Sequence, residues 1–255
     1  MKVGYAVLYE DGTLTISKKH TILQKPIYKD YGEFDDTDVP WARGKDDNCF
    51  IIVQVWILDQ VKSNCMKEWF SDCIDLTTLI DFQNLDVSDC IDFSYLFYEC
   101  QALKDISSLK NWNVSSGKNF AWMFAYCYSL INLSALENWN VSSGEYFSCM
   151  FYRCKLSISI SVLKNWNVSN GRNFDSMFAA CSSLTDISAL KNWQMSNGKD
   201  FRTMFGDCIN LKKIQLPNTL KSLNYQMFEG CSPMLQIHWK DKIYTYDDLK
   251  EYQEF

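Results

Sequence analysis

Cysteine is the residue of this chain whose type and spacing most strongly suggest a chemical role. Seven cysteines recur at intervals of 27, 27, 27, 27, 27 and 23 residues, each three positions after a phenylalanine: Cys73, Cys100, Cys127, Cys154, Cys181, Cys208 and Cys231. Such thiols could form disulfides, ligate a metal or act as nucleophiles. Equivalent positions in stacked copies lie roughly 4.8 Å apart with parallel side chains, a geometry that disfavours disulfides. We interpret the column as a structural ladder of buried, inert thiols.

The other candidates for chemistry are few and scattered. The two histidines, His20 and His238, lie near opposite ends of the chain, so a shared active site is not expected. No Cys-x-x-Cys, His-Glu-x-x-His or phosphate-binding glycine loop is present. The four remaining cysteines are expected to be free thiols, which favours a reducing compartment: Cys49, Cys65, Cys90 and Cys149. The sequence therefore predicts no catalytic residue and no cofactor.

Two groups of carboxylates could form a metal site or an acid–base pair. Asp35, Asp36 and Asp38 could bind calcium, but the other ligands of a known calcium loop are missing, so a solvated acidic turn is favoured and no metal is predicted. Asp105 and Asp186 share a repeat position, yet three repeats separate them by roughly 15 Å at the strand spacing. That distance is too long for paired acid and base catalysis.

Composition limits the class of partner. The 255 residues are 47% hydrophobic and carry a net charge of −6, with no run of basic residues that could follow a phosphate backbone. Nucleic acid is therefore not an expected partner. No apolar stretch is long enough for a transmembrane segment, and the first residues have no signal-peptide core. A cytoplasmic location and export after removal of a leader both stay open.

Each repeat contains two hydrophobic patterns. Phe120, Met123, Phe124 and Cys127 fall at i, i+3, i+4 and i+7, which predicts a short helical turn. The following segment, residues 130–138, matches the leucine-rich-repeat pattern L-x-x-L-x-L-x-x-N and predicts a strand. In the fourth copy the leucine of Lys155-Leu156-Ser157 comes one residue early, so the strand register there stays open.

Three further columns accompany this pattern. An asparagine column is expected to satisfy backbone groups at the corner of each turn: Asn84, Asn111, Asn138, Asn165 and Asn192. Trp112, Trp139 and Trp166 open Trp-Asn-Val-Ser motifs and are expected to cover the corner between strand and helix, although a stacking platform is an alternative. These motifs are also formal glycosylation sequons, but glycosylation is disfavoured because the sequon is part of the repeat unit itself. A glycine column marks a turn with positive φ or close backbone approach: Gly117, Gly144, Gly171 and Gly198.

The ends of the chain look different from its middle. Residues 5–17 predict a β-hairpin around Asp11-Gly12, residues 25–47 a long loop, and residues 49–58 a strand that pairs with the first repeat. Residues 235–246 predict a second hairpin and residues 247–252 a short helix. We predict three parts: an N-terminal hairpin, loop and capping strand over 1–62, a repeat solenoid over 63–231, and a hairpin and helix cap over 232–255.

The phrases Met-Phe-x-x-Cys-x-x-Leu-x-x-Ile and Trp-Asn-Val-Ser, which recur with the same period as the cysteines, resemble the BspA-like leucine-rich-repeat surface proteins of bacteria. The resemblance covers roughly residues 49–255. It implies an α/β solenoid with a parallel β-sheet on one face and short helical turns on the other. It also implies a protein that is usually exported and serves in adhesion or protein binding.

The polar residues on the outward side of the predicted strands are the first candidate binding site. They are expected to form a shallow concave face: Asp105, Ser107, Asn132, Ser134, Ser159, Ser161, Asp186, Ser188, Lys213 and Gln215. The aromatic residues Tyr28, Tyr31, Phe34 and Trp41 of the N-terminal region are a second candidate. The sequence thus favours a non-enzymatic module that binds a protein, with a glycan as the other candidate ligand. An intracellular scaffolding protein is the alternative.

Overall fold

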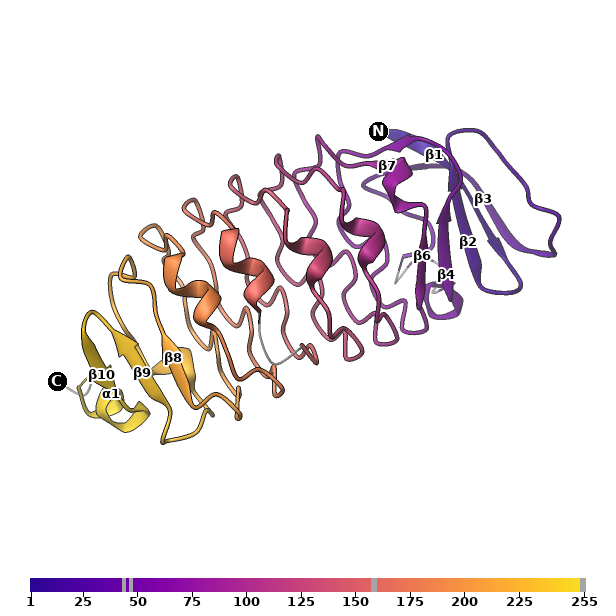
Figure 1. Cartoon of the computed structure of the whole chain (residues 1–255). Coiled ribbons are helices and arrows are strands. Elements are labelled where there is room, and N and C mark those ends of the chain that lie inside the picture. The colour runs from indigo at the N-terminus through magenta and orange to yellow at the C-terminus, as the bar shows by residue number, and fades with distance from the viewer. Residues whose placement is uncertain (43–44, 46–47, 157–159, 253–255) are drawn as a thin grey trace.

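A computed structural model describes residues 1–42, 45, 48–156 and 160–252 of the chain. The molecule is an elongated stack of loops, with a β-sheet at its N-terminal end and a hairpin with a helix at its C-terminal end (Figure 1). Parallel backbone bridges join residues 27 positions apart: Cys65 to Asp92, Asp92 to Asn119, Asn119 to Tyr146, Tyr146 to Asn173 and Asn173 to Asp200. Residues one period apart therefore form columns along the molecule.

The N-terminal end is a five-stranded sheet in the order β3-β1-β2-β4-β6. Its strands are β1 (Lys2–Tyr9), β2 (Thr13–Ser17), β3 (Ile27–Asp35), β4 (Gln54–Ile57) and β6 (Thr78–Ile80). The predicted hairpin is present, with β1 antiparallel to β2 and Gly12 at φ 78° in the turn. Strand β4 pairs in parallel with β6 of the first repeat, as expected, and also with β2. The strand predicted over residues 49–58 is shorter, because a 3₁₀ helix, Asn48–Ile51, occupies its first part.

The predicted loop over residues 25–47 is wrong in its first half, because that half contains β3. This strand pairs antiparallel with β1 through a register that shifts three times. Those irregularities break the simple alternation of apolar and polar residues by which a strand is recognised in a sequence. The edge of β1 opposite β2 thereby obtains hydrogen-bond partners.

The C-terminal end follows the predicted order of elements. Strand β8 (Lys213–Gln215) pairs in parallel with β9 (Gln236–Trp239), and β9 forms a hairpin with β10 (Lys242–Tyr244). Helix α1 (Tyr246–Tyr252) follows, with Asp247 and Asp248 in its first turn. A two-stranded parallel pair, β5 (Val61–Lys62) and β7 (Leu85–Asp86), and a 3₁₀ helix, Tyr225–Phe228, complete the ends of the stack.

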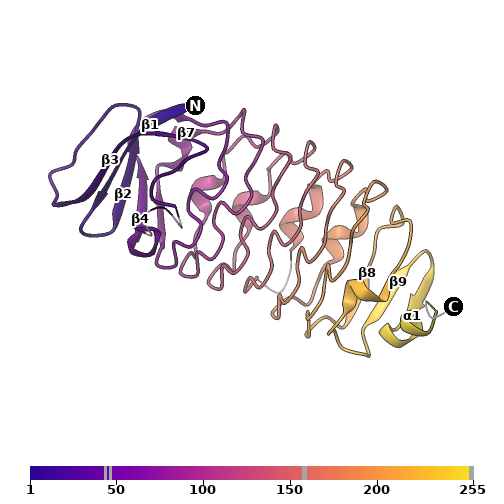
Figure 2. The same ribbon diagram turned by 180° about the vertical axis from the view of Figure 1, so that it is seen from behind.

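The secondary structure of the middle repeats differs from the prediction in both halves of the repeat. The segments expected to be strands carry 3₁₀ helices: Phe82–Asn84, Ser107–Leu109, Ser134–Leu136, Ser161–Asn165 and Ser188–Asn192. Among the described residues, the expected strand occurs only in the first copy, as β6, and in the last copy, as β8 (Lys213–Gln215), where no 3₁₀ helix follows directly. The helices lie along one side of the stack in Figure 1 and behind the loops in the reverse view of Figure 2.

The segment from Phe120 to Cys127, predicted to be a helix, is a ribbon of consecutive turns instead. Trp122 and Tyr126 have φ of 62°, which no α-helix tolerates. Alternate N–H groups point to the next copy, so that those of Phe120, Trp122 and Phe124 donate to its carbonyls at 2.9–3.0 Å. Every backbone donor of the ribbon thus has a partner without a helix. These inter-copy bonds offset the roughly 1–3 kcal/mol that a left-handed non-glycine residue costs.

Two stacks of phenylalanine rings form the core. The first runs through the middle of the repeats, with ring centroids 5.6–6.0 Å apart: Phe70, Phe97, Phe124, Phe151, Phe178, Phe205 and Phe228. The second joins Phe93, Phe120, Phe147, Phe174 and Phe201 at 5.3–5.6 Å. The glycine column is explained by this second stack, because a Cβ on Gly171 would come within 2.2 Å of the Phe174 ring.

The tryptophan column belongs to the core as well and is no open stacking platform. Trp112, Trp139, Trp166 and Trp193 are at most 5% exposed. Each indole N–H donates to a backbone carbonyl of the preceding copy; the bond from Trp166 to Leu136 is 2.9 Å long. The column therefore ties neighbouring copies together by packing and by hydrogen bonds.

Replacing Trp166 with phenylalanine is expected to lower the free energy of unfolding by about 1–3 kcal/mol, because the Leu136 carbonyl then loses its buried donor. Urea denaturation followed by circular dichroism measures the change. Trp239→Phe is the matched control, since the Trp239 Nε1 atom is buried and has no hydrogen-bond partner among the described residues. Equal effects of the two substitutions would mean that the hydrogen bond contributes nothing.

Candidate functional site

The predicted concave strand face does not exist as a strand face. Asp105, Asn132 and Asp186 lie at the starts of 3₁₀ helices, where each accepts a 2.8 Å hydrogen bond from the backbone N–H of the serine two residues later. Those serines, Ser107, Ser134 and Ser188, are exposed, as is Ser161. Lys213 and Gln215 do lie on a strand, β8. Ser159, and with it the open register of the fourth copy at residues 157–159, lies outside the described residues.

The asparagine column is also different from the prediction. Asn84 donates to the Ile57 carbonyl at 3.0 Å, as a ladder residue would. Its equivalents Asn111, Asn138, Asn165 and Asn192 are exposed at the ends of the 3₁₀ helices. A polar column that does connect copies was missed. It consists of Ser116, Ser143, Asn170 and Asn197, whose side chains donate to carbonyls of the preceding copy at 2.7–2.8 Å.

The N-terminal aromatic candidates are largely core. Trp41 and Phe34 are 0% and 3% exposed, and the indole of Trp41 donates to the Trp69 carbonyl. Tyr31 is partly buried and packs against Trp41, so that Tyr28 alone remains well exposed. The predicted surface patch is wrong because these rings pack within the N-terminal sheet and against the first repeat. The sequence did not indicate strand β3 or this packing.

The acidic turn is solvated only in part, because Asp38 is exposed and Asp35 is partly exposed, whereas Asp36 is buried. Asp36 is 2% exposed and accepts hydrogen bonds from the Met1 amino group at 2.8 Å and from the Asn64 N–H at 3.0 Å. No group of three or more His, Cys, Asp or Glu side chains able to hold a metal occurs in the described part of the chain. His20 forms an exposed pair with Asp30 at 2.7 Å.

All eleven cysteines are free, and all seven of the column are buried. From Cys100 onward each column thiol donates to a phenylalanine carbonyl of the preceding copy, at 3.0–3.1 Å. Burial raises the pKa of these thiols, to about 11 for Cys231 and about 12 for Cys181. A thiol that keeps its proton at neutral pH is a poor nucleophile. The column therefore serves packing rather than chemistry.

An aromatic surface covers the outer side of the turn ribbons. It consists of six partly or fully exposed rings from three adjacent copies: Tyr95, Tyr98, Trp122, Tyr126, Tyr128 and Tyr152. Trp122 stacks on Tyr95 with centroids 5.8 Å apart and a 4° angle between the planes, and its edge contacts Tyr152 at 6.0 Å. Tyr126 contacts both Tyr98 and Tyr152, at 5.5 and 5.2 Å.

Arg153 extends the aromatic surface. Its guanidinium lies 5.7 Å from the centroid of the Tyr126 ring and 5.6 Å from that of Tyr152. The hydroxyl of Tyr126 is protonated at neutral pH, since burial raises its pKa further above the usual 10.0. The surface thus offers flat rings, neutral hydroxyls and one cation. The signal in the sequence was aromatic residues at the outward positions of the Phe-x-x-Met-Phe-x-x-Cys motif.

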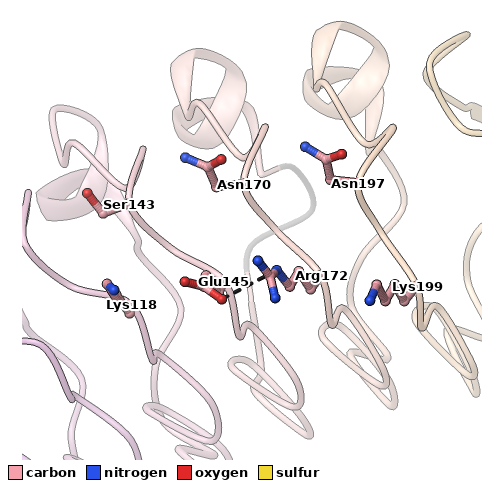
Figure 3. Close-up of a pocket in the computed structure, with 7 residues that line it drawn as sticks. All are labelled: Lys118, Ser143, Glu145, Asn170, Arg172, Asn197 and Lys199. Atoms are coloured by element: carbon pink, nitrogen blue, oxygen red, sulfur yellow. Dashed lines mark ion pairs between the residues drawn. The ribbon is translucent and has the colours of Figure 1, made fainter.

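A polar groove runs across the loops of the third to sixth copies and has a cavity volume of about 540 Å³. One row of its lining consists of Ser143, Asn170 and Asn197, and the other of Lys118, Glu145, Arg172 and Lys199 (Figure 3). Within each row, successive residues come from successive copies of the repeat. Arg172 and Glu145 form an ion pair with 3.4 Å between Nε and Oε2. Neither lysine of the groove has an ion-pair partner within the described ranges.

Comparison with known proteins identifies the repeat. The family model described as "Mycoplasma protein of unknown function, DUF285" matches residues 64–161 and 156–239, which together make up more than two thirds of the chain. No curated protein matches. None of the helices among the described residues has the length and apolar character that a membrane crossing requires.

Two solved structures are similar in part. A leucine-rich repeat protein from Bacteroides ovatus is 15% identical over 93% of this chain, with a TM-score of 0.37. The chain spans about half of that protein's length, at 51%. A leucine rich cell surface protein from Faecalibacterium prausnitzii is 12% identical, with 96% of each chain covered and a TM-score of 0.27.

Proposed function

Because the chain belongs to the DUF285 family, the BspA-type repeat that its motifs predicted, we propose that it is a non-enzymatic binding module whose repeat solenoid recognises a protein partner. The observation that carries this proposal is the aromatic surface around Trp122. Tyrosine, tryptophan and arginine are the residues that most often dominate protein interfaces. Here seven of them adjoin: Tyr95, Tyr98, Trp122, Tyr126, Tyr128, Tyr152 and Arg153.

The aromatic surface suits recognition for two physical reasons. Its rings contact one another, so little side-chain entropy is lost when a partner binds. The backbone beneath it is fixed by hydrogen bonds between copies, which holds the rings at constant spacing. The polar columns at the 3₁₀ helices lack such anchors and are a weaker candidate. Their serines and aspartates are exposed, and several of these groups already bond to one another.

The test uses peptides selected on the wild-type protein from a random-peptide display library. The double substitution Trp122→Asn and Tyr126→Asn removes two rings at positions with φ of 62°, where asparagine is among the least strained side chains. We expect the dissociation constant of selected peptides to rise at least about thirtyfold, as for the loss of a hot spot.

The matched control is Thr203→Asn, which lies in the column of Trp122, three copies further along and outside the aromatic surface, at φ 46°. It should leave affinity within about twofold. If the double substitution leaves the dissociation constant of the selected peptides unchanged, the peptides bind elsewhere on the protein. A library that yields no binder at all would contradict the binding function.

A further inference from the structure

We propose that the groove of Figure 3 is a second binding site, which takes a linear acidic glycan. It shares no residue with the aromatic surface, so its failure would leave the protein-binding proposal standing. The ligand chemistry follows from the two rows of side chains that line the groove, which present opposite hydrogen-bonding character.

The row of Lys118, Glu145, Arg172 and Lys199, which is the lower row in Figure 3, is cationic. Lys118, Arg172 and Lys199 are exposed, and Glu145 is the row's only acid. Three positive charges and one negative charge leave this row at +2, whereas the whole chain carries −6. A concave site of this sign attracts anionic ligands. Arg172 in addition presents a fork of N–H donors that matches carboxylate and sulfate oxygens.

The row of Ser143, Asn170 and Asn197, which is the upper row in Figure 3, offers hydrogen-bond acceptors. The amide nitrogens of Asn170 and Asn197 donate to the Ser142 and Ser169 carbonyls at 2.8 and 2.7 Å, whereas neither amide oxygen has a donor among the described residues. The hydroxyl of Ser143 donates to the Ser115 carbonyl, so that only its lone pairs remain for a ligand. A matching ligand therefore carries donors along one edge and anionic groups along the other.

The spacing of the rows favours a glycan over a peptide. Successive backbone bridges, Asn119 to Tyr146, Tyr146 to Asn173 and Asn173 to Asp200, place adjacent copies at the separation of hydrogen-bonded strands, about 4.8 Å. An extended peptide presents donors on one edge only at every second residue, about 6.6 Å apart. The hydroxyl groups of a sugar chain are more closely spaced than the N–H groups along one edge of a peptide, and the directions of their hydrogen bonds are less constrained. An acidic polysaccharide supplies them together with its carboxylates or sulfates.

The experiment measures binding of defined probes to the whole chain by isothermal titration calorimetry at low and at physiological salt. The probes are an oligogalacturonate, a sulfated dextran oligomer, neutral dextran, poly-glutamate and single-stranded oligothymidylate. We expect one of the acidic glycans to bind, neutral dextran not to bind, and affinity to fall as salt screens the groove. The two acidic glycans distinguish carboxylate from sulfate as the recognised group.

Two variants test the site itself. Replacing Arg172 and Lys199 together with glutamine should weaken glycan binding at least tenfold, whereas Glu145→Gln should strengthen it about threefold or more by removing the groove's only acid. The control is the pair Lys164→Gln and Lys191→Gln, which removes two exposed cations of adjacent copies outside the groove. All variants should keep the wild-type thermal midpoint.

The proposal is overturned if the Arg172 and Lys199 pair behaves like the control pair. Tighter binding of poly-glutamate would identify an acidic-peptide groove instead, and tighter binding of the oligonucleotide a nucleic-acid groove. Absence of binding by both acidic glycans would likewise reject it.

Discussion

Between pH 9 and pH 11 the protein is expected to lose its stability steeply, whereas between pH 6 and pH 8 the thiol column leaves the stability unchanged. Burial raises the pKa of the column thiols from their usual 9.0, to about 11 at Cys231, to about 12 at Cys181, and well above 9.0 at Cys73, Cys100 and Cys154. The unfolded chain therefore releases these protons at lower pH than the folded chain does. The stabilisation is complete below about pH 9 and is lost as pH rises toward the folded-state pKa values.

The expected slope is large because the column has seven members. Each thiol that ionises only in the unfolded chain lowers the free energy of unfolding by about 1.4 kcal/mol per pH unit. Seven thiols give roughly 10 kcal/mol per pH unit, which compares with a total stability of about 5–15 kcal/mol for ordinary proteins. Urea denaturation followed by circular dichroism at pH 7, 9 and 10 measures this slope.

Removal of one thiol supplies the control for the alkaline transition. Cys127→Ala should reduce the slope by about 1.4 kcal/mol per pH unit, whatever packing energy it costs at pH 7. The same substitution at Cys65, which is partly exposed, should have a smaller effect because burial raises its pKa less. Thiolate absorbance from the folded protein below pH 9 would contradict the burial on which the prediction rests.

Phe124→Ala is expected to lower the free energy of unfolding by about 3–5 kcal/mol. Phe124 is 0% exposed and lies between Phe97 and Phe151, with ring centroids 5.6 and 5.8 Å away. Its removal leaves a cavity within the stack, and the neighbouring copies cannot close it because their backbones are tied by hydrogen bonds. Urea midpoints at pH 7 measure the effect.

A phenylalanine outside the stack gives the comparison for Phe124. Phe50 is 40% exposed in the 3₁₀ helix before β4, and Phe50→Ala should cost less than about 1 kcal/mol. If the Phe124 variant unfolds at the wild-type urea concentration, the ring stack is not the source of stability. Phe151→Ala, one copy further on and equally buried, should reproduce the Phe124 result.

The sequence predicted which residues form the core, but its prediction of secondary structure was wrong in both halves of the middle repeats. The spacing i, i+3, i+4, i+7 of Phe120, Met123, Phe124 and Cys127 fits one face of a helix, and it also fits consecutive four-residue turns. In the second arrangement Trp122 and Tyr126 adopt positive φ and their N–H groups reach the next copy. Local propensity does not distinguish the two, because the deciding acceptors belong to the next copy and lie far along the chain.

The candidate sites depended on this distinction. A strand at residues 130–138 would have faced Asn132 and Ser134 outward on a sheet, whereas the 3₁₀ helix makes them parts of a local turn. A helix at residues 120–127 would have held Trp122 and Tyr126 about 8–10 Å from the equivalent rings of neighbouring copies, the distance between packed helices. The turn ribbon instead aligns them with Tyr95, Tyr98 and Tyr152.

The sequence by itself determined the period, the columns, the hairpins at both ends and the inward set of phenylalanine, cysteine, leucine and tryptophan side chains. These follow from repetition and apolar character, which are properties of the chain alone. Only the tertiary structure decided which backbone groups bond within a copy and which bond between copies. That choice depends on carbonyls supplied by the neighbouring copy, and it determines which side chains meet on the aromatic surface and in the groove.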